Sequence, residues 1–104
     1  MRPKSVTKTG TGTTNWMPLD IKQAPFNVAI GCEIVSGTAT YSVEHTFDDV
    51  FDSAVTPTAF TNSGLSAKTV SADGNYAAPV RAIRLNVTAG AAPVVKMTMI
   101  QGLR

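Results

Sequence analysis

Two neighbouring segments of this 104-residue chain alternate between apolar and polar side chains. In residues 26–35 and 38–47, every second position carries an apolar or aromatic side chain, and the positions between are mostly small or polar. Since successive side chains of a strand point to opposite faces, this period of two predicts strands with one buried face and one solvated face. Only Ser36 and Gly37 separate the segments, so we expect them to pair as a hairpin. An antiparallel sheet with one apolar face needs a cover, and a second sheet is the expected one.

The C-terminal third of the chain alternates in the same way. Residues 82–88 and 94–100 place large apolar side chains at every second position, and residues 89–93 between them predict a five-residue hairpin loop. Residues 16–21 alternate as well, and Pro18 favours a position at the edge of a sheet. Both regions therefore add strands to the expected sheets.

Residues 48–78 are rich in Asp, Ser, Thr, Asn, Gly and Pro, but the stretch is long for a structureless loop inside a small domain. We expect one or two short strands within it, best placed at residues 53–60 and 68–71, and a turn at residues 73–75, whose Gly74 tolerates a positive φ. The whole pattern predicts an all-β protein: an antiparallel β-sandwich or jelly-roll-like fold of about six to eight strands.

Length and composition favour a single domain. After Met1, residues 1–15 contain Val6 as their one large apolar side chain, so we expect an N-terminal arm or weak edge strand there, and a single β-sandwich domain in residues 16–104. No apolar run approaches the roughly 18 residues of a membrane span, and the N-terminus leads into polar threonines instead of a signal peptide. We therefore expect a soluble protein made in a cytoplasm, without a membrane partner.

The sequence offers few groups for catalysis. Cys32 and His45, the single cysteine and histidine, both fall on the apolar parity of their segments. This position favours a small buried hydrophobe for Cys32, and a histidine at the edge of the core, hydrogen-bonded through one ring nitrogen, for His45. The glycines at positions 10 and 12 are not followed by the lysine of a phosphate-binding loop. We expect no enzyme activity and no cofactor.

Metal and nucleic-acid binding are also weakly supported. The acidic stretch with Asp48, Asp49 and Asp52 lacks the alternating acids and the glycine of a calcium loop, so a turn that presents acids to a basic partner fits better. A net charge of +2 is too small to indicate a nucleic-acid binder, and most aromatic residues share the apolar parity of their segments. Trp16 is the exception, and it is expected to cover an edge of the sandwich or to anchor a protein contact.

Charges are unevenly distributed along the chain. Arg2, Lys4 and Lys8 make the start basic, residues 33–52 contain five acids and no Lys or Arg, and residues 75–104 contain four Lys or Arg residues and no acid. Such separation suits docking on a partner, although solvated outer faces and loops would produce the same pattern.

Three stretches carry a family resemblance. The first begins with residues 2–6 and ends with Trp16-Met17-Pro18-Leu19-Asp20. The other two are residues 43–51 (VEHTFDDVF) and residues 79–87 (PVRAIRLNV). With them the chain resembles the small virion structural proteins of tailed bacteriophages, and among these the head decoration or cement proteins. The resemblance implies a non-enzymatic subunit, present in many copies on the capsid exterior and assembled in the host cytoplasm. Its implied partners are the major capsid protein and neighbouring copies of itself.

We therefore expect a capsid decoration protein. In this hypothesis Arg2, Lys4 and Lys8 clamp an acidic surface, and the acidic loop of Asp48, Asp49 and Asp52 meets a basic one. A tail, neck or head-fibre component is the first alternative, because such proteins share fold and composition. A carbohydrate-binding module is the second, with Trp16 and Tyr76 as the aromatic residues available for stacking on a sugar.

Overall fold

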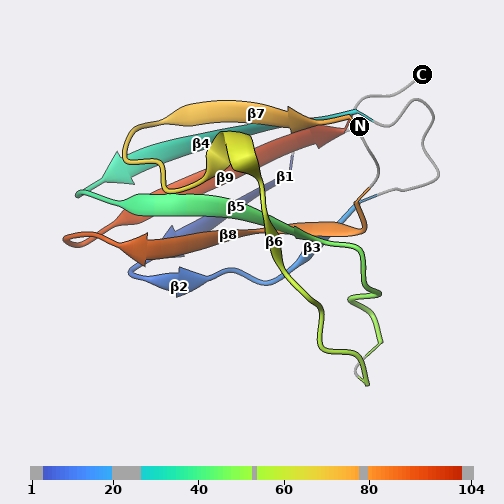
Figure 1. Ribbon diagram of the computed structural model, residues 1–104. Coiled ribbons are helices and arrows are strands. Elements are labelled where there is room, and N and C mark those ends of the chain that lie inside the picture. Colours follow the sequence, from blue (N-terminus) through green and yellow to red (C-terminus); the bar gives the residue numbers. More distant parts are fainter. Residues whose placement is uncertain (1–3, 20–26, 53, 78–79, 102–104) are drawn as a thin grey trace.

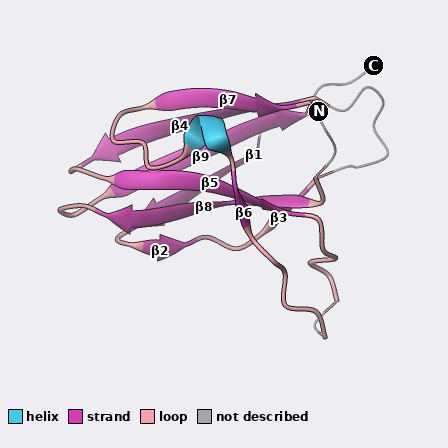
Figure 2. Ribbon diagram, viewed as in Figure 1, coloured by secondary structure: helices cyan, strands magenta, loops and turns pink. Residues whose placement is uncertain are grey.

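The computed structural model describes residues 4–19, 27–52, 54–77 and 80–101, and these form two antiparallel sheets (Figure 1). The first sheet has four strands in the order β1 (Lys4–Thr9), β9 (Val94–Gln101), β4 (Val28–Ser36) and β7 (Ala72–Tyr76). The second sheet has five, in which β8 (Ala82–Ala89) pairs with β5 (Thr40–Thr46), β2 (Gly12–Thr13) and β3 (Met17–Pro18), and β5 also pairs with β6 (Phe60–Thr61). One 3-10 turn, η1 (Ser63–Leu65), lies between β6 and β7 in the chain (Figure 2).

The connectivity is that of a jelly roll. β2 and β3 both pair with β8, so they act as one interrupted strand along its edge. Counted this way there are eight strands, and consecutive strands alternate between the two sheets except for β5 and β6, which are neighbours in the second sheet. Two four-stranded layers joined in this manner form the double-sheet jelly roll. The all-β sandwich or jelly-roll-like fold predicted from the sequence is therefore confirmed.

Both predicted hairpins are wrong, because each connection crosses from one sheet to the other. β4 lies in the first sheet and β5 in the second, and β8 and β9 are separated in the same way. Alternation reveals which side of a strand is buried, and two facing strands bury their inner sides just as paired ones do. The crossing loops brace each other: the backbone N–H of Thr38 donates to the Ala91 carbonyl at 3.2 Å, and the Ala91 N–H donates to Thr38 Oγ1 at 3.0 Å.

The core lies between the sheets and follows the predicted parity. The inward-parity apolar side chains of the four long inner strands are buried in one cluster: Val28, Ile30, Cys32, Tyr41, Val43, Ile83, Leu85, Val87, Val95, Met97 and Met99. Cys32 is therefore a buried hydrophobe, as expected. Ala82, at the start of β8, is also buried although it falls on the outward parity. The parity fails at the end of the second alternating segment, where Phe47 is 57% exposed. The chain leaves the sheet after Thr46, so the alternation no longer points inward there.

The strands predicted in residues 48–78 are misplaced. Of the described residues 54–60 only Phe60 belongs to a strand, and within residues 68–71 only Lys68 makes an isolated bridge, to Tyr41. The predicted turn at residues 73–75 lies inside β7 instead. Its glycine serves packing, because a Cβ at Gly74 would stand 3.0 Å from Cδ1 of the fully buried Leu65.

The N-terminal segment is part of the fold. All six residues of β1 pair with β9, so Lys4–Thr9 form an edge strand of the first sheet. The chain before residue 15 and the chain after it therefore contribute strands to the same fold. Lys4 and Lys8 share the parity of Val6, which packs against the core. Lys8 is partly buried, and its Cε and Nζ would lie 3.3 Å from a Cβ added at Gly12, whereas Lys4 is exposed. A partly buried lysine on an edge strand discourages pairing with another chain. Of the strand expected at residues 16–21, β3 is present and residues 20 and 21 lie outside the described residues.

Candidate interaction surface

A cluster of aromatic rings closes one end of the sandwich. The ring of His45, at the end of β5, lies 5.2 Å from that of Tyr76, 5.6 Å from that of Phe47 and 6.0 Å from that of Phe60, measured between centroids. Tyr76 is buried, whereas Phe47 is 57% and Phe60 49% exposed. The apolar core therefore continues outward through His45 to an exposed aromatic surface.

His45 has a structural part in this cluster. Its Nδ1 lies 2.9 Å from the hydroxyl oxygen of Tyr76, which is the single ring-nitrogen hydrogen bond expected from the sequence. Burial lowers the pKa of His45 from its ordinary 6.5, and burial raises the pKa of Tyr76 to about 12. Both side chains are therefore uncharged at neutral pH, and they hold the aromatic rings in place without adding charge to the surface.

The acidic residues lie beside the rings, in the loop of residues 47–59 that joins β5 to β6. Each carboxylate accepts a backbone N–H of the same loop: Asp48 from Thr58 at 2.7 Å, Asp49 from Phe51 at 2.9 Å and Asp52 from Ala54 at 2.9 Å. Side-chain oxygens that bond to nearby backbone in this way fix tight turns. The acids thus shape the loop, as the turn interpretation of the sequence predicted. Among the described residues, no group of three or more His, Cys, Asp or Glu side chains is placed to hold a metal ion.

The loop presents apolar side chains as well as acids. Phe51 is 79% exposed and Val55 is exposed, and the loop extends away from both sheets (Figure 1). An ion pair of 3.4 Å joins Asp49 of this loop to Arg81, the residue before β8. We call Phe47, Phe51, Val55 and Phe60, together with Asp48, Asp49 and Asp52, the loop-end patch. Within it the Phe47 and Phe60 rings are in contact, with centroids 5.7 Å apart. Exposed apolar side chains flanked by polar ones are typical of interaction sites.

The other predicted site residues lie elsewhere. Lys4 and Lys8 lie on β1 at the edge of the first sheet, and Arg2 lies outside the described residues. Trp16 lies on the edge of the second sheet, just before β3. The structure therefore brings the three acids into one loop, whereas Lys4 and Lys8 lie on a different sheet from the one that Trp16 borders.

Sequence reasoning missed the neighbours of Trp16. The guanidinium carbon of Arg84, on β8, lies 4.3 Å from the centroid of the Trp16 ring. Arg84 Nε donates to Glu44 Oε1 at 2.7 Å, and Asn86 Nδ2 donates to Glu44 Oε2 at 3.0 Å. Arg84, Glu44 and Asn86 share the outward parity of their strands. They come into contact because β5 pairs with β8 in a register that places Glu44 opposite Arg84. Alternation in the sequence predicts which side chains point outward, but it does not predict which strands pair.

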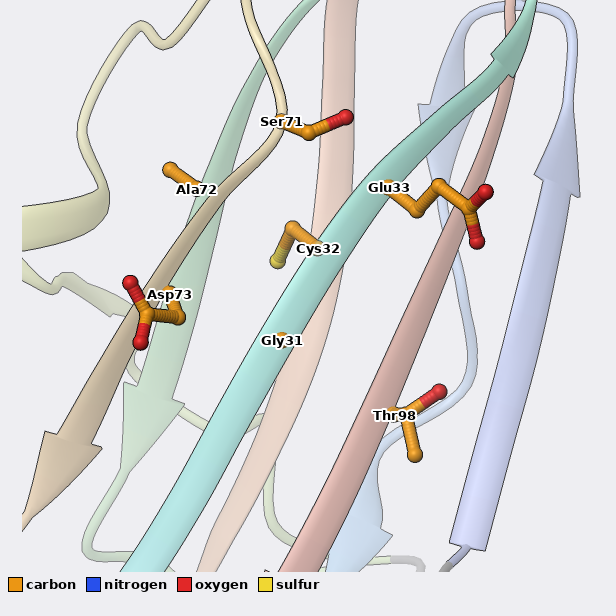
Figure 3. A pocket seen from close by; sticks show the side chains of 7 residues that line it. All are labelled: Gly31, Cys32, Glu33, Ser71, Ala72, Asp73 and Thr98. Carbon is orange, nitrogen blue, oxygen red and sulfur yellow. The ribbon is translucent and has the colours of Figure 1, made fainter.

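A shallow groove crosses the outer face of the first sheet, with a volume of about 400 Å³. Gly31 and Glu33 of β4, Asp73 of β7 and Thr98 of β9 line it (Figure 3). The neighbouring Cys32 is buried, and burial raises the pKa of its thiol to about 12. A thiol with such a pKa is protonated at neutral pH, so Cys32 does not supply a nucleophile to the groove.

The fold is a jelly-roll domain that carries an exposed aromatic patch. No protein-family model and no curated protein matches the sequence. Among solved structures, a chain of the Bacillus endospore appendages, described as disulfide-linked pili, is 15% identical with a TM-score of 0.54, and the match covers 99% of this chain and 87% of that one. YomS, a protein derived from the SPBc2 prophage, is 10% identical with a TM-score of 0.52, over 98% of this chain and 96% of that one. At these identities the likeness shows a shared fold.

One further finding concerns membranes. Within the described ranges, no helix is long and apolar enough to cross a bilayer.

Proposed function

We propose that this protein is a bacteriophage capsid decoration protein, which binds the outer surface of the head and stabilises contacts between major capsid subunits. The observation that carries the proposal is the loop-end patch, an exposed aromatic surface on a jelly-roll domain. Burying a phenylalanine side chain contributes roughly 1.5–3 kcal/mol relative to leaving it exposed. Phe47, Phe51 and Phe60 therefore supply enough apolar surface to anchor a protein contact, and the adjacent acids select a basic partner.

The structural neighbours support an assembled role. One is a chain of a pilus and the other derives from a prophage, and both share this fold over nearly the whole chain. Repetition explains why a small patch suffices, because many modest contacts add up when each copy bridges subunits of a closed shell. The proposed partners are the major capsid protein and neighbouring copies of the chain, and the proposed location is the exterior of the virion.

The proposed basic clamp takes a different form from the arm expected from the sequence. Lys4 and Lys8 belong to β1, which forms a full edge of the first sheet. Deleting residues 1–14 would remove β1 and β2, so the loss of capsid binding by that variant would not distinguish docking from folding. Charge reversal of Lys4, which is exposed, tests the clamp with the strand intact.

The docking surface is tested by binding to heads purified without the decoration protein. We expect the wild-type protein to saturate a fixed number of sites per head, and the F47S/F60S variant to lose most of its occupancy at equal concentration. Val70→Ser is the matched control, because it also removes an exposed apolar side chain but from the loop before β7. Undiminished occupancy of F47S/F60S, measured by co-sedimentation, would overturn the assignment of the surface.

The same assay separates the alternatives. A tail, neck or head-fibre component would not bind along the surface of the heads. It would instead bind purified tails or necks, at a few copies per particle. A carbohydrate-binding module would bind in a glycan screen. The structure weakens the basis of that second alternative, because Tyr76 is buried and Arg84 covers one face of the Trp16 ring.

A further inference from the structure

The outer face of the second sheet carries the guanidinium group of Arg84, which is fixed by its neighbours but makes a single hydrogen bond to the described residues. Three contacts described above fix Arg84: its Nε bonds to Glu44, Asn86 holds Glu44 from the other side, and the guanidinium lies over the Trp16 ring. The Arg84 side chain is 24% exposed and that of Glu44 13% exposed. The plane of the guanidinium is therefore set before any partner arrives.

Most of the hydrogen-bonding capacity of Arg84 remains available. A guanidinium has five N–H donors. Among the described residues only Nε has a hydrogen-bond partner, so the four N–H groups on Nη1 and Nη2 are left for another acceptor. Two parallel N–H groups match the two oxygens of a carboxylate, and an arginine that is already immobilised loses less side-chain entropy on binding.

We propose that Trp16, Arg84, Glu44 and Asn86 form a receptor for a carboxylate group of a partner protein, from an acidic side chain or a chain terminus. The carboxylate accepts two hydrogen bonds from the Nη atoms of Arg84, and the exposed part of Trp16 contacts the apolar neighbour of that acid. This inference does not depend on capsid docking, because it concerns a different face of the molecule from the loop-end patch.

The site favours a carboxylate over a phosphate group. Glu44 lies 2.7 Å from Arg84 Nε and offsets much of the guanidinium charge. Phosphate at neutral pH carries close to two negative charges, which Glu44 repels more strongly than the single charge of a carboxylate. Phosphate sites usually gather several bases, whereas Arg84 is the one cation in the described contacts of this cluster.

The test is an NMR titration of the isolated, ¹⁵N-labelled full chain with sodium acetate at constant ionic strength. We expect the Trp16 indole and Arg84 Nε–H signals to shift and saturate in the millimolar range. Arg84→Gln is expected to abolish the response and Arg84→Lys to lose most of it, because a lysine keeps the charge without the planar fork. Arg81→Gln is the matched control, since Arg81 pairs with Asp49 outside the cluster, and it should titrate like the wild type.

Glu44→Gln separates a receptor from a merely structural ion pair. A glutamine still accepts from Arg84 Nε but removes the competing charge, so acetate is expected to bind several-fold more tightly to this variant. Signal dispersion in the same spectra verifies that each variant is folded. The proposal is overturned if acetate leaves the wild-type signals unmoved, if E44Q binds no better than the wild type, or if inorganic phosphate shifts these signals at lower concentration than acetate does.

Discussion

Replacing Gly37 with alanine tests the crossing of the chain between the two sheets. Gly37 has a φ of 73° and lies in the loop between β4 and β5, against the loop between β8 and β9. A Cβ at this position would stand 2.6 Å from the carbonyl oxygen of Ala91 and would overlap that of Ala92. Because these are backbone atoms braced by hydrogen bonds to Thr38, they cannot move aside as a flexible side chain would.

The expected loss of stability has two parts. An L-residue with a side chain in the left-handed region costs about 1–2 kcal/mol relative to glycine. Overpacking against fixed neighbours costs about 1–3 kcal/mol more. The sum, about 2–5 kcal/mol, is a large part of the 5–15 kcal/mol that typically stabilises a domain. For a chain of this size it lowers the melting temperature by roughly 10 °C or more.

The assay is urea unfolding of G37A followed by circular dichroism, with Gly31→Ala as the matched control. Gly31 lies on the solvent side of β4, and no atom stands within 4 Å of a Cβ added there. The control is expected to match the wild type or to gain up to about 1 kcal/mol through the unfolded state. A G37A variant as stable as G31A would refute the packing of the two crossing loops.

Three further changes probe the core and its edge. Leu65→Ala, at the fully buried side chain that packs over Gly74, is expected to cost about 2–5 kcal/mol in chemical unfolding through the cavity it leaves. Tyr41→Phe removes a buried hydroxyl that donates to the Val70 carbonyl at 2.7 Å, and should cost about 1–2 kcal/mol in the same assay. Burial lowers the pKa of His45 below its ordinary 6.5, so as the pH falls the unfolded chain takes up the proton first and the folded state loses stability below about pH 6.5. His45→Phe is expected to flatten that part of the pH profile, and an unchanged slope would contradict the burial argument.

The sequence predicts the buried faces of this fold far better than its strand pairing. The inward parity of Val28, Ile83 and Met97 follows from alternation alone, because burial of one strand face is a local property. Pairing depends on where a loop sends the chain, and Gly37 permits a sharp reversal whether the next strand joins the same sheet or the opposite one. Gly74 illustrates the same limit, since a glycine that makes room for Leu65 looks like a turn former in sequence.

The candidate sites also differ in how far the sequence predicts them. The acids of the loop-end patch are adjacent in sequence, so a local pattern finds them and also predicts their turn-forming hydrogen bonds. The exposure of Phe47 is not predictable from parity, because it depends on where β5 ends. Arg84 and Glu44 are 40 positions apart and meet only through strand register, so no local pattern reveals their contact with Trp16.

The two proposed surfaces differ in chemistry, and this difference bears on what one copy can bind. The loop-end patch offers phenylalanines and acids, which suit a partner with apolar and basic groups, whereas the cluster around Arg84 suits an acidic group. A single partner surface of uniform chemistry does not match both the loop-end patch and the Arg84 cluster. Binding through both at once therefore requires two different partner surfaces. A subunit that bridges neighbours meets this condition, and a subunit that binds one site in isolation does not. F47S/F60S and R84Q should therefore each weaken assembly, and the two losses should add if the surfaces bind different partners without coupling through the β5–β6 pair that joins them.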